Sequence, residues 1–213
     1  MKLINWWTVS IETAFDELAE YATRMEAQIA VMAKLDRERI SVAELTEEDH
    51  DEALAQHYWL FAEALPRTLR YSCIGLLLTT IETALLRICR QMEKDRQLPL
   101  PVGALKGSAL ERSLTYIKKL GRVTLPAHSF EQVVTHLSTI RQCIVHAAGN
   151  IELMSHPTPK VVRDAARQLD GFGIPGDDFI EIAPGVCARL IRDASAWMRA
   201  VLGAAELSFR VEW

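Results

Sequence analysis

The segment from Cys73 to Ile88 restricts the fold of this chain more than any other part of it. It is apolar at most positions, contains no proline, and is too long for an ordinary buried strand. Read as a helix it is apolar on nearly all sides, which is typical of a helix in the centre of a protein. Glu82 and Arg87 interrupt the run, so it falls short of a membrane span. We therefore expect a central buried helix and no insertion into a membrane.

Cap signals and apolar periodicity predict helices along most of the remaining chain. Ser108 and Ser129 each begin the pattern of a helix N-terminal capping box, and Thr46 begins a similar signal. Pro66 is expected to end or kink the helix that it meets, because proline lacks a backbone N–H. The predicted helices cover about 10–39, 47–65, 68–95, 108–120, 130–147 and 185–206, with a short helix ending near 169 and one short strand at 179–182. The predicted fold class is an all-α helical bundle with a long N-terminal helix and a minor β excursion in the C-terminal third.

The predicted N-terminal helix carries a single apolar seam, which has two interpretations. Its residues recur at alternating steps of four and three, as in a coiled coil. They are Ile11, Phe15, Leu18, Ala22, Met25, Ile29 and Met32. Such a seam packs either on the bundle of its own chain or on a partner chain.

The charge is unevenly distributed along the 213 residues, although the formal net charge is only −4. Residues 1–63 carry a net charge of −9, residues 64–149 carry +7, and residues 150–213 carry −2. A net negative chain is not a general nucleic-acid binder, but its basic middle third suits an anionic ligand or an acidic partner surface. The alternative is that the acidic and basic segments attract each other within one fold.

The four cysteines predict a reducing compartment. They lie far apart in apolar helical surroundings, without a Cys-x-x-Cys pair, so we expect buried, reduced thiols and neither a disulfide framework nor a zinc site. The first residues lack the apolar core and the small-residue cleavage site of a signal peptide. The expected localisation is therefore cytoplasmic, and the length fits one domain.

Arg141 and His146 are the candidate catalytic residues. They lie five positions apart near the end of an apolar helix, and Gly149 provides a stop signal directly after them. The planar fork of arginine matches phosphate oxygens, and histidine gains and loses a proton near neutral pH. Together these groups have the chemistry to cleave a phosphodiester without a metal, since one moves a proton and the other stabilises developing charge.

Helix geometry limits how this pair can act. Residues five apart are rotated by roughly 140° around an ideal helix, so Arg141 and His146 cannot point the same way. We expect them to flank a groove where two such helices pack, with each chain of a dimer contributing its own pair. The helix dipole favours the protonated form of a histidine in the last turn, which suits a general acid. The structural alternative is that His146 caps the helix and that Arg141 pairs with a carboxylate.

The segment around Arg141 resembles the signature of the HEPN superfamily, in which an arginine precedes a histidine by four to six residues late in a helical bundle. Here Gln142 to Val145 intervene, and the exit from Ala147 to Asn150 resembles the small, glycine-containing exit of that family. The preceding helices are similar as well, so the resemblance covers about residues 68–153. It implies one HEPN-like domain over 1–213, in which 1–65 adds acidic helices and 154–213 forms a C-terminal helical extension.

The resemblance implies a metal-independent endoribonuclease of toxin–antitoxin or phage-defence type that acts as a homodimer on RNA. His146 would move the proton of the ribose 2′-hydroxyl or of the leaving 5′-oxygen, and Arg141 would stabilise the pentavalent phosphate. The products would carry 2′,3′-cyclic phosphate ends. No metal and no other cofactor is expected, whereas an antitoxin or regulatory protein is a possible partner. Active members often have Asn, Asp or His after the arginine, and Gln142 departs from that pattern because it cannot titrate.

Glu82, Gln142 and Asn150 are the supporting candidates. A carboxylate such as Glu82 in an apolar helix needs a partner, which is either Arg141, in a supporting role, or a nearby basic residue such as Arg87 or Lys118. Two other functions remain open. One is a non-catalytic dimeric adaptor that binds RNA, nucleotide or an acidic protein through its basic middle third. The other is a structural protein that uses the N-terminal seam, in which neither motif residue matters.

Overall fold

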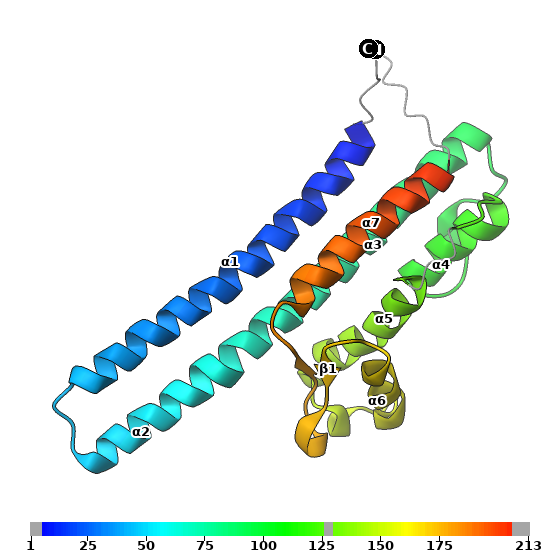
Figure 1. Ribbon diagram of the computed structural model, residues 1–213. Helices are drawn as coiled ribbons and strands as arrows, with labels where there is room; N and C mark the ends of the chain where they lie inside the picture. The colour runs from blue at the N-terminus through cyan, green and yellow to red at the C-terminus, as the bar shows by residue number, and fades with distance from the viewer. Residues whose placement is uncertain (1–5, 126–129, 206–213) are drawn as a thin grey trace. The chain divides into compact units, whose positions relative to one another are not determined.

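The computed structural model of this chain describes residues 6–125 and 130–205, and most of these residues are helical (Figure 1). Within these residues the strands form one antiparallel pair, in which Phe172 faces Ile182 and Gly173 faces Glu181. The predicted all-α fold with a small β excursion near the C-terminal third is therefore confirmed.

The elements follow one another as predicted, apart from the junction at Pro66. The α-helices are α1 (Trp6–Val42), α2 (Glu47–Tyr58), α3 (Leu65–Arg96), α4 (Ala109–Thr115), α5 (Phe130–Ala147), α6 (Pro159–Arg167) and α7 (Val186–Ala204). The remaining elements are the turns η1 (Trp59–Ala64), η2 (Val102–Ala104), η3 (Tyr116–Leu120), η4 (Ile151–Leu153) and η5 (Pro175–Asp177) and the strands β1 (Phe172–Gly173) and β2 (Glu181–Ile182). The predicted cap at Ser129 and the predicted helix end near residue 206 lie outside the described residues.

Two of the predicted caps have the expected hydrogen bonds. The hydroxyl of Ser108 accepts from the backbone N–H of Glu111 at 3.2 Å, and the Glu111 carboxylate accepts from the backbone N–H of Ser108 at 2.8 Å. These bonds lower the pKa of Glu111, because they stabilise its ionised form. The hydroxyl of Thr46 accepts from the backbone N–H of Asp49 at 3.2 Å at the start of α2. The first turns of α4 and α2 are thus determined by local side chains.

The prediction that one helix ends at Leu65 and another begins near Thr68 was wrong, whereas a kink at Pro66 stays a prediction. One helix runs from Glu47 to Arg96. The physical reason is η1, a π-helical turn directly before the proline, in which the N–H of Leu65 bonds to the carbonyl of Leu60, five residues back. A wider turn relieves the clash between the proline ring and the preceding carbonyl, and it tolerates the missing N–H. Helix therefore continues through Pro66.

The chain divides into two compact units that share the long helices. Unit 1 comprises the chain up to Leu18, Leu76–Thr135 and the chain from Arg189 onward, whereas unit 2 comprises Ala19–Gly75 and His136–Ala188. Each unit has its own buried apolar core. In unit 1 the second half of α3 is the most buried helix segment, with about two buried residues in each turn; these include Leu77, Leu78, Ile81, Leu85 and Ile88.

In unit 2 the second half of α1 turns back through residues 43–46 into α2 (Figure 1). The two helices meet through the ring Nδ1 of His57 and the carboxylate of Asp36, which lie 3.0 Å apart. The apolar seam of α1 differs in burial between its first and its second half. Ile11, Phe15, Leu18 and Ala22 are buried, whereas Met25 and Met32 are exposed and Ile29 is half-buried. The seam therefore packs on its own chain only over its first half.

Within the described residues one helix, the continuous helix Glu47–Arg96, is long and apolar enough to cross a membrane by length and composition alone. Half of its most apolar stretch is buried inside the protein, as is common for a core helix.

Candidate functional site

The end of α5 positions the two candidate catalytic residues. In unit 2 this helix buries Leu137, Ile140, Cys143 and Ala147 on one side. Gln142 and His146 lie on the opposite, exposed side. The apolar positions recur at steps of three and four, so burial of this stripe forces the polar motif residues outward.

The structure brings His146 and Gln142 onto one face and places Arg141 at the flank. His146 is exposed in the last turn of α5, and Gln142 precedes it by one turn. Residues four apart are neighbours on a helix surface, so these two side chains are available to the same ligand. Arg141 is half-buried, and its five-residue offset rotates it by roughly 140° from the histidine. A site that uses both residues therefore needs a ligand or a second helix that spans them.

Gly149 is required by the path of the chain after α5. Its φ of +83° lies in the left-handed region, and Ala148 before it has a φ of +50°. The N–H of Gly149 donates to the carbonyl of Cys143 at 3.2 Å and thus closes the helix. A β-carbon at Gly149 would overlap the hydroxyl of Tyr71 on α3. The glycine exit of the motif is therefore also a close contact between the motif helix and α3.

Asn150 stabilises the chain directly after α5 through its side chain and its backbone. Its side-chain oxygen accepts from the backbone N–H of Glu152 at 2.9 Å and caps the short turn η4. Asn150 also forms an antiparallel bridge with Phe179. This residue ties the exit of α5 to the segment that leads into β2.

Tyr71 connects that exit to a second part of the unit. The tyrosine hydroxyl donates to the carbonyl of Ile180 at 2.6 Å, and the N–H of Ile180 donates to the carbonyl of Gly149 at 3.0 Å. Burial raises the pKa of Tyr71 well above its ordinary value, whereas Arg67 lowers it and Cys143 and Glu181 raise it further. Tyr71 is thus a protonated donor at neutral pH.

Arg70, one residue before Tyr71 on α3, bonds to both α1 and β2. Its Nε donates to the carboxylate of Glu26 at 3.0 Å and its Nη1 donates to the carbonyl of Ile182 at 2.9 Å. The second oxygen of Glu26 accepts from the backbone N–H of Gly185 at 3.0 Å. These bonds fix the loop after β2 against α1 and α3.

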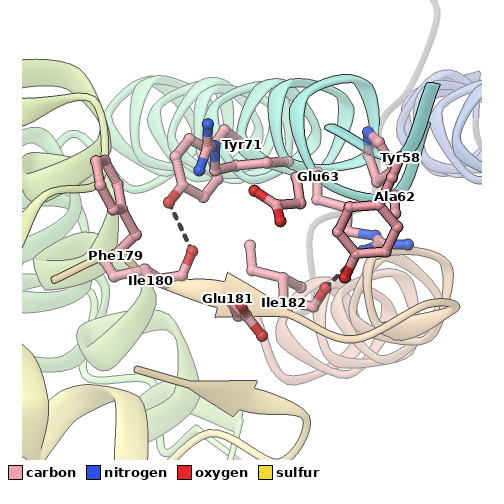
Figure 2. Close-up of a pocket in the computed structure, with 11 residues that line it drawn as sticks. Tyr58, Ala62, Glu63, Tyr71, Phe179, Ile180, Glu181 and Ile182 are labelled. Atoms are coloured by element: carbon pink, nitrogen blue, oxygen red, sulfur yellow. Dashed lines mark hydrogen bonds between the residues drawn. The ribbon is translucent and has the colours of Figure 1, made fainter. Parts of the chain in front are cut away.

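A pocket of about 280 Å³ lies between α3 and the segment that contains β2 (Figure 2). It is lined by Tyr58, Ala62, Glu63, Pro66, Arg67, Arg70, Tyr71, Phe179, Ile180, Glu181 and Ile182. All of these residues belong to unit 2. The guanidinium carbon of Arg67 lies 5.0 Å from the centre of the Phe179 ring, a cation–π distance. Figure 2 shows the carboxylate of Glu63 directed into the space between Tyr71 and Ile182.

The described thiols do not offer a nucleophile at this site. Cys143, on the motif helix, is fully buried, and burial raises its pKa to about 11. The thiol of Cys187 donates to the carbonyl of Arg70 at 3.7 Å, and both Cys73 and Cys187 are buried. Within residues 6–125 and 130–205 no three His, Cys, Asp or Glu side chains are grouped as metal ligands.

Glu82 is half-buried on α3 and belongs to unit 1, whereas Arg141 belongs to unit 2. Its supporting role for Arg141 stays a prediction.

The pocket was not predicted from the sequence, because its two walls come from distant segments; Tyr71 and Ile180, for example, are 109 positions apart. The one signal in the sequence was the predicted strand at 179–182, which forms one wall. No protein-family model, curated protein or solved structure matches this chain.

Proposed function

We propose that this chain is a metal-independent endoribonuclease of toxin or phage-defence type. The proposal rests on one observation, namely an exposed histidine in the last turn of α5 with the half-buried Arg141 on the flank of the same helix. An exposed side chain such as His146 contributes little to packing, so its presence at the end of a helix that also carries Arg141 favours chemistry over stability. The resemblance of the surrounding segment to the HEPN superfamily supports the same function.

In the proposed reaction His146 accepts the proton of a ribose 2′-hydroxyl while the 2′-oxygen attacks the adjacent phosphorus. The bond from phosphorus to the 5′-oxygen breaks, and a histidinium returns a proton to that leaving oxygen. Arg141 stabilises the additional negative charge on the pentavalent phosphate. The products are a 2′,3′-cyclic phosphate and a 5′-hydroxyl, and no electron transfer or co-reactant is needed.

A homodimer would complete the site. His146 makes no side-chain hydrogen bond to the described residues of its own chain, so substrate or a second protomer must orient it. Val145, beside His146, is 63% exposed and Leu153, in η4 just after the exit, is 74% exposed. Exposed apolar side chains of this size next to a polar motif are typical of an interface. A second copy of α5 packed here would cover them and add a second Arg/His pair.

The experiment is cleavage of labelled RNA by purified protein in EDTA, with detection of cyclic-phosphate ends. Wild-type protein should cleave, and His146→Ala should reduce the rate about 10²–10⁴-fold. His136→Ala, on the same helix but half-buried and nearly three turns earlier, is the matched control and should retain full activity. Equal cleavage by wild type and His146→Ala would assign the nuclease to another site or to a contaminant.

The second candidate is a non-catalytic adaptor, which is favoured by the absence of an orienting hydrogen bond on His146 within the described residues. An adaptor would bind RNA or an acidic partner through Arg141 without cleaving it. Binding that is lost in Arg141→Ala but retained in His146→Ala, together with no cleavage by wild type, would establish this alternative.

A further inference from the structure

We propose that the pocket between α3 and β2 binds a single guanine base of the RNA. This inference rests on the proposed nuclease, because it names the feature of the substrate that the same unit recognises. The pocket of about 280 Å³ is slightly smaller than a typical site for a drug-sized ligand, so it suits one base and not a folded oligonucleotide.

The charges of the lining favour a neutral, flat ligand. Arg67 and Arg70 are cationic, Glu63 and Glu181 are anionic, and aromatic side chains lie among them. The formal charges of these four side chains sum to zero, so the lining selects neither a simple cation nor a simple anion by net charge. A ring that presents donors on one edge and acceptors on another is compatible with both signs. Nucleobases are such rings, and proteins bind unpaired bases by stacking them on aromatic side chains and arginine planes.

Guanine matches Glu63 and Arg67, two of the three charged groups that line the pocket without an ion pair among the described residues. Its N1–H and N2–H groups are adjacent donors, which a carboxylate such as Glu63 can accept as a pair. Its O6 and N7 atoms are the acceptors that arginine binds bidentately. Arg67 lies over the face of Phe179, so the N–H groups at its edge stay available in the plane of the guanidinium. Adenine offers neither pair in this arrangement.

The hydrogen bonds of the remaining groups leave the pocket open for this ligand. The Tyr71 hydroxyl is occupied by the carbonyl of Ile180, and Arg70 is occupied by Glu26 and the carbonyl of Ile182. These residues therefore form rigid walls. Glu63 belongs to the π-helical turn η1, and such turns occur frequently at functional sites.

The pocket is also connected to the motif helix. Its wall at Ile180 is bonded to Gly149, three residues after His146. The buried thiol of Cys143, between the two motif residues, lies close enough to influence the pKa of Tyr71. One hydrogen bond thus links the wall of the pocket to the backbone directly after the motif helix.

The test is titration calorimetry of the whole chain in EDTA with guanosine, inosine and adenosine, none of which has a phosphodiester to cleave. Guanosine should bind more tightly than inosine, which lacks the N2 amino group, and adenosine should bind weakest. Glu63→Gln should weaken guanosine about 10- to 100-fold, because a charge-assisted pair is replaced by a neutral amide. Glu47→Gln, an exposed carboxylate of α2 outside the pocket, is the matched control and should leave all three affinities unchanged.

Equal affinity for guanosine and adenosine, or unchanged guanosine affinity in folded Glu63→Gln, would overturn the inference. The outcome is separable from that of the nuclease. Cleavage of RNA without a preference for guanosine sites would reject the pocket and retain the nuclease. Guanosine binding by a protein that never cleaves RNA would retain the pocket and reject the nuclease.

Discussion

The hydroxyl of Tyr71 donates a 2.6 Å hydrogen bond to the carbonyl of Ile180, while its ring lies against the α-carbon of Gly149. One side chain of α3 thus holds two segments that lie far from it in the sequence. These are the exit of the motif helix and the segment that leads into β2. The geometry of the candidate catalytic helix and that of the pocket consequently depend on the same tyrosine.

Gly149→Ala should destabilise the protein by about 2–4 kcal/mol, because it combines a left-handed backbone with overlap of the Tyr71 ring. The measurement is the free energy of unfolding from urea titration. Gly176→Ala is the control, since Gly176 has a φ of +67° but open space around it. Equal losses in the two variants would show that backbone strain alone is responsible and that the Tyr71 contact is unimportant.

Arg141→Ala should slow RNA cleavage about as much as His146→Ala, whereas Arg141→Lys should restore only part of the rate. Lysine keeps the positive charge but lacks the planar fork that binds two phosphate oxygens. Initial rates on a labelled RNA in EDTA provide the measurement. Arg167→Ala removes an exposed arginine of α6 that pairs with Asp164, and it should cleave like wild type. Full activity in Arg141→Lys would mean that charge alone matters at this position.

Val145→Glu should convert the proposed dimer into monomers and abolish cleavage without unfolding the chain. The glutamate would place an unpaired charge in an apolar interface, which disfavours association by several kcal/mol. Light scattering after size exclusion measures the mass, and circular dichroism verifies the helix content. Val161→Glu alters a similarly exposed valine of α6 and should leave the mass unchanged. A wild-type protein that is monomeric at tens of micromolar would contradict this prediction directly.

The buried thiols should make the protein less stable in alkaline solution. Burial raises the pKa of Cys143 to about 11 and that of Cys89 to about 12, from an ordinary value of 9.0. A group with a raised folded-state pKa contributes stability below its unfolded pKa and loses that contribution as the pH rises through the folded value. The free energy of unfolding should therefore fall by about 4 kcal/mol between pH 9 and pH 11, with similar shares from the two thiols. Cys143→Ala should reduce this slope; an unchanged slope would assign the loss to other groups.

The sequence predicted those features that depend on nearby residues. Ser108 and Thr46 predict the starts of α4 and α2, because the hydrogen bonds of each cap lie within one helical turn. The turn of the helix that carries His146 was predicted in the same way, because the apolar residues of that helix recur at helical spacing. The continuity of the helix at Pro66 was not predictable by these rules, because relief comes from a widened turn for which residues 59–64 carry no recognised signal. The contact between Arg67 and Phe179 was invisible for another reason, since only the tertiary fold brings such distant residues together.

The π-helical turn η1 gives the continuous helix Glu47–Arg96 a rotational phase that an unbroken α-helix would not have. A turn closed by bonds five residues apart contains roughly one residue more than an α-turn, and one residue corresponds to about 100° of rotation. Deleting Ala62 would let the turn relax to an α-turn while preserving every other residue. Tyr58 would then swing around the axis relative to Arg67, and the pocket would lose one wall without losing any part of its chemistry. The additional residue of η1 therefore sets the rotation of α2 about the helix axis relative to α3, and with it which side chains of the two helices lie on the same face.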